Sequence, residues 1–408
     1  MKILQLAQFY DPVIGGEERH VNTLSQSLAQ RGHSVTLITF ATSLDEGESR
    51  DGEVRIIRVR SSASRLPFLY SNPSWPHAVP VPDPAITRAI SKEVGANLPD
   101  IAHGHNWIIN SALKPLRRAG VPIIVTLHDY SQVCPTKRFV EKREHECTGP
   151  EPAKCMACSA DKFGRLSGAT TFLGNVVMSR QRRRNVNQFI SVSHAVASRV
   201  AIRSNETMVA AGVNSTVIPN FIPDSQIVDD ILPPTSDAPI VFVGDMSNDK
   251  GISVLLDAYG RLQDPPQLIL VGRYTPETPP NLPSGASATG PLPHSEAMNI
   301  LKGARLMVVP STCQDSCPTV VLEGMAAGRP VVASAVGGIT DMVVDGETGL
   351  LVPPGNAEAL SVSIAKVLGD PKLASSMGSA GRDRSRSYTV SAVVDRLEKI
   401  YYEHVSAR

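Results

Sequence analysis

The sequence contains no run of about 18 apolar residues, and this absence argues against a helix that spans a membrane. An excess of charge of one sign is also missing, because 40 basic residues stand against 39 acidic ones, which excludes a general nucleic-acid-binding protein. Cysteine is scarce, with six residues among 408, and this favours a reducing compartment over a disulfide framework. The first residues, MKILQLA, form an apolar strand pattern without a signal-peptide profile. We therefore expect a cytoplasmic protein.

What the sequence does contain is a regular alternation of short apolar runs with segments of helical periodicity. This alternation predicts parallel sheets covered by helices, and 408 residues are enough for two domains. The expected strands of the first half are 3–7, 35–40, 54–59, 100–103, 122–127 and 188–192, and its expected helices are 17–31, 84–97, 107–119 and 194–204. The expected strands of the second half are 240–243, 267–271, 305–309, 330–333 and 349–352.

A segment rich in Pro and Asp, 219–238, separates the two halves and is typical of a hinge. We therefore predict a first doubly wound, Rossmann-like domain at 1–218 and a second at 219–387. Residues 388–408 are expected to form a terminal helix. In doubly wound domains, ligands bind beyond the carboxyl ends of the strands, so two such domains that face each other would share one cleft.

The most informative stretch is 311–334, which reads STCQDSCPTVVLEGMAAGRPVVAS. Pro318 is placed to open a helix that Gly328 stops, so that Asp315 precedes this helix and Glu323 lies in its second turn. The unpartnered amides of the first helical turn lie between the two acids. This arrangement offers acceptors for the diols of a ligand and N–H donors for its negative charge. The alternative is a pair of solvated acids at an ordinary loop–helix junction.

The string resembles the donor-binding motif of retaining glycosyltransferases of family four, the GT-B group that includes glycogen synthases and phosphatidylinositol mannosyltransferases. The resemblance implies that Asp315 contacts hydroxyls of the donor sugar and that Glu323 holds the nucleotide ribose. Asp stands here in place of the usual Glu, and the usual Gly-Phe-Gly is replaced. We assign the three residues that replace it and the residue that follows them to the donor-binding site. They are Ser316, Cys317, Pro318 and Thr319. In relatives of this fold the terminal helix crosses back to the first domain, which we expect here.

Two motifs of the first half carry the same resemblance. Gly15-Gly16 follows the first strand and precedes a helix, which is typical of a plain turn but also resembles the family's G-G-x-E loop over donor phosphates or acceptor. His128-Asp129 follows the strand at 122–127 in the context T-L-H-D. A lone His is usually structural, whereas in the family this His lies beside the donor sugar and helps to polarise the reaction centre. The resemblance thus implies donor contacts for Gly15, Gly16 and His128.

The loop after the strand at 240–243 resembles the family's diphosphate-binding pattern of Gly-Arg, four residues and Lys-Gly. Lys250 is in register, but Asp245 stands where the Arg is expected. We therefore assign diphosphate neutralisation to Lys250 with help from Arg273 in a following loop, and we expect Asp245 to be turned away or paired with a cation. Gly337-Gly338 resembles the family's G-G-x-x-E loop, with a plain turn as the alternative.

Four of the six cysteines lie within 25 residues: Cys134, Cys147, Cys155 and Cys158. The surrounding insertion, about 130–162, lacks helical periodicity, so we expect a long loop that requires some means of ordering. One structural zinc ion held by four thiolates would provide it. An iron–sulfur cluster, a disulfide pair and four free thiols are the alternatives. The family resemblance implies that no metal takes part in the chemistry itself.

A basic run at 180–184 follows a moderately apolar stretch at 173–178. This pattern indicates either a solvated helix face or a peripheral contact with anionic lipid or an anionic acceptor. The sequence carries no signal for the oligomeric state.

Together these features predict a retaining glycosyltransferase of the hexosyltransferase type. It would move a sugar from a nucleotide-diphosphate sugar, with UDP or GDP as the nucleotide, to an acceptor hydroxyl in the synthesis of a glycan, glycolipid or glycosylated metabolite. Two alternatives come from other classes, namely a GT-B epimerase or hydrolase of nucleotide sugars and a catalytically silent binding protein. The loops expected to contact the acceptor, 61–84 and the Cys-rich insertion, carry no specific code.

Overall fold

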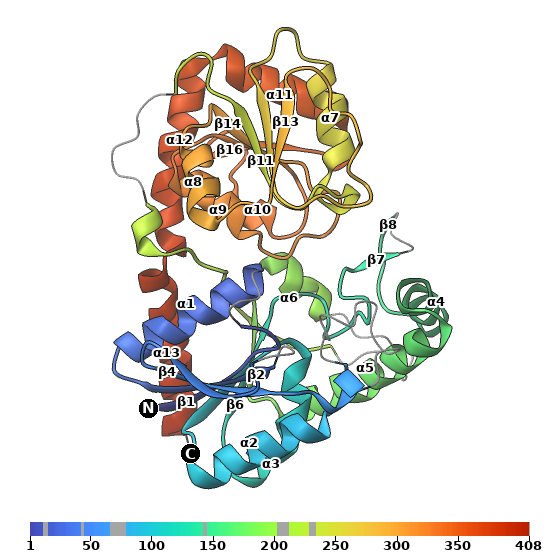
Figure 1. Ribbon diagram of the computed structural model, residues 1–408, viewed down its shortest axis with the longest axis vertical. Coiled ribbons are helices and arrows are strands. Elements are labelled where there is room, and N and C mark those ends of the chain that lie inside the picture. Colours follow the sequence, from blue (N-terminus) through green and yellow to red (C-terminus); the bar gives the residue numbers. More distant parts are fainter. Residues whose placement is uncertain are drawn as a thin grey trace. The chain divides into compact units, whose positions relative to one another are not determined.

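The computed structural model describes residues 1–10, 15–41, 45–65, 79–141, 145–201, 212–227 and 234–407. The chain divides into two compact units, one made of Met1–Pro219 together with Val394–Arg408 and the other of Asn220–Val393. Each unit is an α/β fold around a largely parallel sheet (Figure 1). The two units are described separately below.

The first unit is built on an eight-stranded sheet with the order β10-β9-β6-β5-β1-β2-β4-β3. Neighbouring strands run parallel, except for the antiparallel pair of β3 and β4. The central strands β1, β5 and β6 are almost entirely buried, as expected for a parallel sheet covered on both faces. The strand bounds are β1 Lys2–Leu6, β2 Ser34–Phe40, β3 Gly47–Asp51, β4 Val54–Val59, β5 Ile101–His105, β6 Ile123–Leu127, β9 Gln188–Ser191 and β10 Thr216–Val217.

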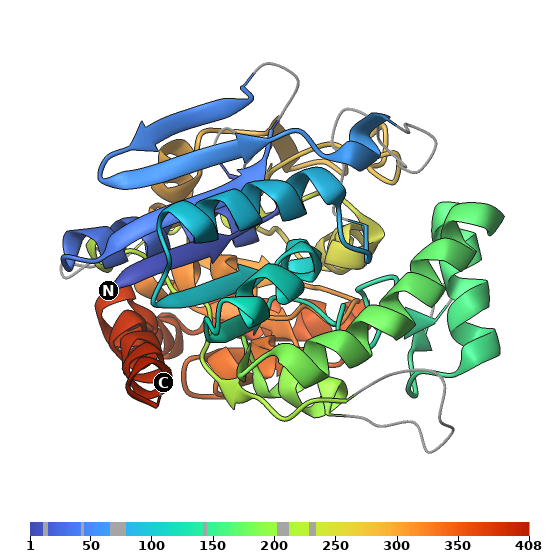
Figure 2. The same ribbon diagram turned by 90° about the horizontal axis from the view of Figure 1, so that it is seen from below.

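Helices cover both faces of this sheet, with α1 on one face and α2 and α3 on the other (Figures 1 and 2). A small hairpin of β7 and β8 and the helical pair α4 and α5 follow β6 in the chain, and Figure 2 shows the two helices side by side. The bounds are α1 Gly16–Gln30, η1 Ser62–Arg65, α2 Pro84–Ala96, η3 Asn106–Ser111, α3 Leu113–Arg118, β7 Val140–Glu141, β8 His145–Glu146, α4 Pro152–Phe163, α5 Arg165–Asn185, α6 His194–Val200 and α13 Val390–Ser406.

The C-terminal part of α13, from Val394 onward, belongs to the first unit. Leu397 and Tyr401, four residues apart and therefore on one face of the helix, are both buried. Nearer the surface, Glu398 accepts from Arg31 Nη1 at 2.5 Å and lies 2.6 Å from His33 Nε2. Apolar packing and ion pairing thus both anchor α13 to this unit.

The second unit has a six-stranded parallel sheet with the order β13-β12-β11-β14-β15-β16. Its core combines the strands with α7 and α11, which pack against each other, while α9 packs against α12. The bounds are η4 Asp224–Gln226, β11 Ile240–Val243, η5 Asn248–Lys250, α7 Ile252–Gly260, β12 Leu268–Val271, β13 Ala286–Gly290, α8 His294–Lys302, β14 Leu306–Val309, α9 Thr319–Ala326, β15 Val331–Ser334, α10 Ile339–Met342, β16 Gly349–Val352, α11 Ala357–Gly369, α12 Pro371–Ser385 and η6 Arg386–Tyr388.

Every expected strand is present, with ends that agree to within two residues, but the helix predicted at 107–119 is wrong. The chain forms the 3-10 segment η3 and then restarts as α3 at Leu113. Pro115 explains the break, because it has no N–H to donate and its ring would clash with the carbonyl of Ser111 in a continuous helix. In the restarted helix Pro115 lies in the first turn, where the N–H has no partner. The helix predicted at 194–204 ends at Val200, and residues 202–211 lie outside the described part.

The prediction of a long loop without helical periodicity at about 130–162 is also wrong, because helix α4 occupies Pro152–Phe163. Its buried face is made by Cys155 and Ser159, small side chains that pack close to α5, rather than by the usual aliphatic residues. Pro152 at the first helical position favours the helix start. Helix α5 was not predicted, and neither was the edge strand β3, whose sequence GESRD is mostly exposed.

Candidate functional site

In the second unit, the loops that follow β11 and β14 meet at the carboxyl ends of the strands. Lys250, at the end of η5, donates from Nζ to Oδ2 of Asp315 at 2.5 Å, and Ser311 Oγ lies 3.4 Å from the same oxygen. Desolvation lowers the pKa of Lys250, but the charge and hydrogen bond of Asp315, with the charges of Cys313 and Asp245, raise it, so that the pKa lies above its usual value. The pair therefore holds a charged ammonium group at the edge of the sheet.

Two glycines allow these loops to approach each other. Gly251 has φ +78°, and a Cβ at this position would lie 1.9 Å from the carbonyl oxygen of Pro310. Gly337 has φ +57°, and its Cβ would lie 2.0 Å from the oxygen of Asp315. Residues with a side chain would be strained at both positions and would push the loops apart. The Gly337-Gly338 turn thus supports the Asp315 loop, and Gly338 N donates to Asp315 O at 2.7 Å.

Helix α9 begins at Thr319, directly after Pro318, and carries Glu323 on a buried position of its second turn. Cys317 precedes it and is also buried, with a backbone oxygen that accepts from Asn220 Nδ2 at 2.9 Å. Burial raises the pKa of the Cys317 thiol to about 12, so it lines the loop as a neutral group. Ser316 lies between Asp315 and this buried thiol in the loop.

Glu323 has a partner that sequence reasoning missed. The Nε2 atom of His294, the first residue of α8, is 2.8 Å from Oε1 of Glu323. A single His after a proline carries no sequence signal, and only the packing of α8 against α9 creates the contact. The Glu323 carboxylate is thus held by a neighbouring imidazole at the carboxyl edge of the sheet.

Asp245 is paired with Arg273, as one of the alternatives from the sequence predicted. The guanidinium donates through Nε to Oδ1 at 2.9 Å and through Nη2 to Oδ2 at 2.8 Å. The hydrogen bond and charge of Asp245 raise the pKa of Arg273. This two-point contact fixes the direction of a planar guanidinium whose side chain is 69% exposed. In the family pattern an Arg occupies the position of Asp245. Here Asp245 instead binds Arg273 of the neighbouring loop and so holds an arginine beside that position.

We expect Asp245→Asn and Asp245→Arg both to lower turnover by about three- to fivefold, because an exposed ion pair contributes at most about 1 kcal/mol. The loss arises because Arg273 is no longer oriented. Asp257→Asn is the matched control, since Asp257 makes the same two-point contact with Arg261 on α7. Steady-state kinetics and calorimetry with a donor nucleotide measure the effect. Tighter nucleotide binding with undiminished turnover in Asp245→Arg would show that Asp245 only repels the donor.

In the first unit, Gly15 precedes α1 in an extended conformation, with φ −148°, and Gly16 begins the helix. A Cβ on Gly15 would lie 2.2 Å from Oε2 of Glu18, whereas one on Gly16 would meet no atom within 4 Å. Residues 11–14 of the predicted turn lie outside the described part of the chain. The Glu18 carboxyl group therefore lies close to the start of α1.

Glu17 and Glu18, in the first turn of α1, are acids to which sequence reasoning gave no role. Burial raises the pKa of each to about 7, and the charge of Glu17 adds to the effect on Glu18. Asn106, at φ +54°, donates from Nδ2 to Glu17 Oε1 at 2.7 Å. Two carboxyl groups that titrate near neutral pH thus lie at the end of the sheet where the first domain was expected to bind ligands.

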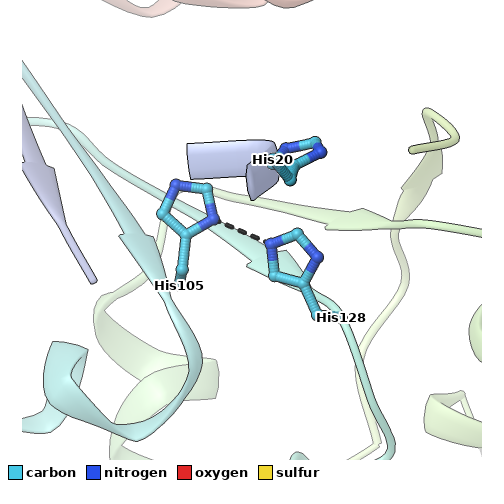
Figure 3. A group of neighbouring side chains, drawn as sticks. All are labelled: His20, His105 and His128. Atoms are coloured by element: carbon cyan, nitrogen blue, oxygen red, sulfur yellow. Dashed lines mark hydrogen bonds between the residues drawn. The ribbon is translucent and has the colours of Figure 1, made fainter. Parts of the chain in front are cut away.

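His128 directly follows β6 and is buried next to two further histidines, His20 of α1 and His105 of β5 (Figure 3). His105 Nδ1 and His128 Nε2 are 2.9 Å apart, and the His20 ring meets the His128 ring edge-on with centroids 4.8 Å apart. Burial lowers the pKa of His20 and of His105 well below the usual value. Asp129 turns back to accept from Ser131 N at 2.7 Å, which orients the loop.

These three histidines form the one group in the described residues that brings three metal-ligand atoms of His, Cys, Asp or Glu within 4.8 Å of one another. Both ring nitrogens of His105 are already engaged, one with His128 and one with Gln5. In the observed arrangement His105 therefore has no ring nitrogen left for a metal ion.

The four clustered cysteines come from three places, namely the turn after β6, the residue after β8 and the first turns of α4. In the described residues no three of their sulfurs come within 4.8 Å of one another. Burial, together with the charges of the three other thiols, raises the pKa of Cys155 to about 12. All four are free thiols that lie near enough to influence one another.

The prediction of a continuous basic run at 180–184 needs a correction, because Arg182 is buried. Its guanidinium donates to Gln132 Oε1 at 2.8 Å, to Asn110 Oδ1 at 3.0 Å and to Asn175 Oδ1 at 3.0 Å. Burial lowers its pKa to about 9. Arg182 therefore ties α5 to the first unit. The exposed large apolar residues of α5 are Leu166, Leu173 and Val177, whose spacing puts them on one helix face.

Comparison with known proteins identifies the class. A family model described as "Glycosyltransferase Family 4" matches residues 14–226, and one described as "Glycosyl transferases group 1" matches residues 238–370. The chain belongs to glycosyltransferase family 4 and is a retaining glycosyltransferase with the GT-B fold. No helix in the described residues is long and apolar enough to cross a membrane.

Individual relatives agree with this assignment. Glycogen synthase from Mycobacterium tuberculosis is 26% identical over 415 residues, which cover 95% of this chain and 91% of that protein. D-inositol 3-phosphate glycosyltransferase from Corynebacterium aurimucosum is 26% identical over 419 residues, with coverage of 96% and 92%. Among solved structures, sucrose-phosphate synthase from Thermosynechococcus elongatus has a TM-score of 0.72 at 22% identity over the whole of both chains. Anabaena HepE in complex with UDP-glucose has a TM-score of 0.68 at 15% identity, covering 99% of this chain and 100% of that one.

Proposed function

We propose that this glycosyltransferase moves a hexosyl group from a UDP- or GDP-sugar to an acceptor hydroxyl, and that the donor binds at the carboxyl ends of the strands of the second unit. The contact between Lys250 and Asp315, made where α9 begins, is the observation that carries this proposal. It brings a cation for a diphosphate and an acceptor for sugar hydroxyls to one edge. Glu323, on the next turn of α9, would bind the ribose diol.

The proposed roles follow the charge that develops in the reaction. Departure of the nucleoside diphosphate builds negative charge on the β-phosphate and positive charge on the sugar. Lys250 would neutralise the phosphate, assisted by Arg273 and by the amides at Gly15, Gly16 and the start of α9. Asp315 and His128 would align the sugar. The leaving phosphate would take the proton of the acceptor hydroxyl on the same face, which retains the configuration at the anomeric carbon.

The nucleotide UDP has the additional support that the related Anabaena protein was solved with UDP-glucose. Incubation with a panel of UDP- and GDP-sugars and candidate acceptors, followed by mass spectrometry, tests the proposal. A transfer product supports it. Free monosaccharide alone would indicate a hydrolase, an epimerised donor would indicate an epimerase, and an unchanged donor with each acceptor would indicate a binding protein.

We also propose that the four clustered cysteines hold one structural metal ion, most simply zinc. Thiols form the donor set that zinc and iron–sulfur clusters prefer, and they would lose their protons on binding. Cys134 and Cys147 would join α4, through Cys155 and Cys158, to the segment after β6. The ion would order this insertion and take no part in transfer.

Elemental analysis of protein prepared without added metal should find about one zinc ion per chain, as a four-cysteine site would hold. Cys155→Ser should lower the thermal stability of the first unit while leaving nucleotide affinity unchanged, because the proposed donor contacts of Lys250 and Glu323 belong to the second unit. Ser159→Ala is the matched control, since it alters another small buried side chain of α4 and leaves the four thiols in place. A preparation that contains neither zinc nor iron would remove the proposal.

Two further features concern the cellular compartment and a contact with membranes. Six free thiols fit a reducing compartment, and on this composition we propose a cytoplasmic protein. The exposed apolar face of α5, with Arg183 and Arg184 exposed at its end, supports a peripheral contact with anionic lipid. Flotation with vesicles that contain or lack anionic lipid tests this contact, and equal absence from both would exclude it.

A further inference from the structure

A set of buried polar side chains connects His128 to the interior of the first unit. His105 Nδ1 lies 2.9 Å from His128 Nε2, and His105 Nε2 lies 3.1 Å from Oε1 of Gln5 on β1. All three side chains are at most 8% exposed. Figure 3 shows the imidazoles of His105 and His128 turned toward each other through these two nitrogens. The three residues come from β1, β5 and the loop after β6, which are neighbours in the sheet order.

A second set of bonds lies beside the first. Tyr401 of α13 has its hydroxyl 2.6 Å from His103 Nδ1, and His103 Nε2 lies 2.7 Å from Thr126 Oγ1. The rings of His103 and His105 are tilted against each other with centroids 4.4 Å apart. Burial lowers the pKa of His103 to about 3, so this ring is uncharged as well. His103 and His105 are therefore both uncharged at neutral pH.

The hydrogen bonds fix the proton positions. A neutral imidazole has one donor nitrogen and one acceptor nitrogen. The Gln5 oxygen can only accept, so His105 carries its proton on Nε2, and its Nδ1 becomes an acceptor. His128 must then donate through Nε2–H, so that a neutral His128 ring has its lone pair on Nδ1.

We propose that Gln5 and His105 are positioning residues that hold His128 in its Nε2–H tautomer, so that Nδ1 accepts a hydrogen bond from a hydroxyl of the substrate sugar. The functional part of this inference rests on the role given to His128 under the proposed function. A lone pair on Nδ1, facing the sugar, would be compatible with the positive charge that grows on the sugar during transfer. A ring that presented N–H or a positive charge would oppose it.

Nuclear magnetic resonance of the full chain labelled with ¹⁵N-histidine tests the tautomer directly, because the protonated and unprotonated ring nitrogens resonate in different ranges. We expect His128 to be protonated on Nε2 and not on Nδ1. His128→Gln identifies its signals. Protonation of His128 on Nδ1 in the unaltered protein would overturn the proposal, since it would mean either that the His128 ring is a cation or that the Gln5 amide donates to His105.

Two variants of Gln5 extend the test to function. Gln5→Met removes the acceptor at similar size, so it should give a mixture of His128 tautomers and lower kcat by about tenfold at unchanged donor affinity, as for other residues that orient a functional histidine. Gln5→Glu can only accept where its buried carboxyl group is ionised, so above the pKa of that group it should keep the Nε2–H tautomer and retain more of kcat than Gln5→Met. Loss of this tautomer in Gln5→Glu at a pH where the carboxyl group is ionised would contradict the assigned direction.

Thr126→Val is the matched control, because it removes a buried hydroxyl that contacts His103 beside the same histidines and leaves Gln5 and His105 in place. It should leave the His128 tautomer unchanged even if it lowers thermal stability. An equal effect of Thr126→Val and Gln5→Met on the His128 signals would mean that the network acts only through stability. Full activity of His128→Ala would overturn the proposed role of His128, while the tautomer is measured independently of it.

Discussion

Replacing Lys250 by alanine is expected to lower kcat by about 100-fold or more, while the donor Kd rises by less than about tenfold. The reason is that negative charge on the leaving diphosphate is larger in the transition state than in the bound donor, so a cation there stabilises the transition state more. At an effective dielectric constant of about 20, a unit charge at about 4 Å contributes roughly 4 kcal/mol before desolvation, enough for such an effect. The variant also leaves Asp315 without its cation, which adds to the loss.

Single-turnover kinetics and calorimetry with the donor nucleotide separate the two quantities. Lys250→Arg keeps the charge and should retain part of the turnover. Lys366→Ala, on α11 in the same unit, is a control for removal of a lysine away from the strand ends and should match the unaltered protein. If Lys250→Ala raised Kd as much as it lowered kcat, Lys250 would be a binding residue without a special role in the transition state.

Glu323→Ala is expected to weaken nucleotide binding by about 30- to 100-fold, since a hydrogen bond to a charged group contributes about 2–3 kcal/mol. Turnover at subsaturating donor should fall by the same factor, because the ribose contact is present in the bound donor and in the transition state alike. Titration calorimetry with UDP and with GDP measures the loss. It also shows which nucleotide this chain prefers.

The bond between Glu323 and His294 sets the controls for this experiment. His294→Gln removes the imidazole but leaves the carboxylate, and should change the affinity by a smaller factor than Glu323→Ala. Thermal unfolding of both variants checks that α9 stays folded, because Glu323 is buried and its partner His294 would remain. An unchanged donor affinity in Glu323→Ala would mean that the motif at 311–334 has been assigned to the wrong ligand.

The sequence predicted the strands well because buried parallel strands are continuous apolar runs. The prediction of secondary structure failed for elements that are not marked by a pattern of apolar residues. Strand β3 is an exposed edge whose charged residues give no apolar pattern. Helix α4 buries Cys155 and Ser159, which a search for aliphatic periodicity passes over. The break before α3 could have been predicted, since Pro115 alone forbids the continuous helix.

In the candidate site, too, some residues could be predicted from the sequence and others could not. Lys250, Asp315 and Glu323 belong to local patterns that follow strands, and local patterns can be read from one chain. The partners of these residues come from other strands and helices. The contact of His294 with Glu323 depends on the packing of α8 against α9, and the bidentate contact of Asp245 with Arg273 joins the loops after β11 and β12. The contact of His105 with His128 likewise required the sheet order.

The hydrogen bond between His103 and Tyr401 has a consequence for how the protein folds during its synthesis on the ribosome. The two residues are 298 positions apart, yet they meet in the interior of one unit. At about 5–20 residues per second, Tyr401 is synthesised about 15 to 60 s after His103. Once Val217 has been made, the first unit has all its strands but still lacks the helix that contacts His103. From then until Tyr401 is made, the second unit, Asn220–Val393, is synthesised and can fold around its own continuous segment. The half of the chain that is translated first is therefore the half that is completed last.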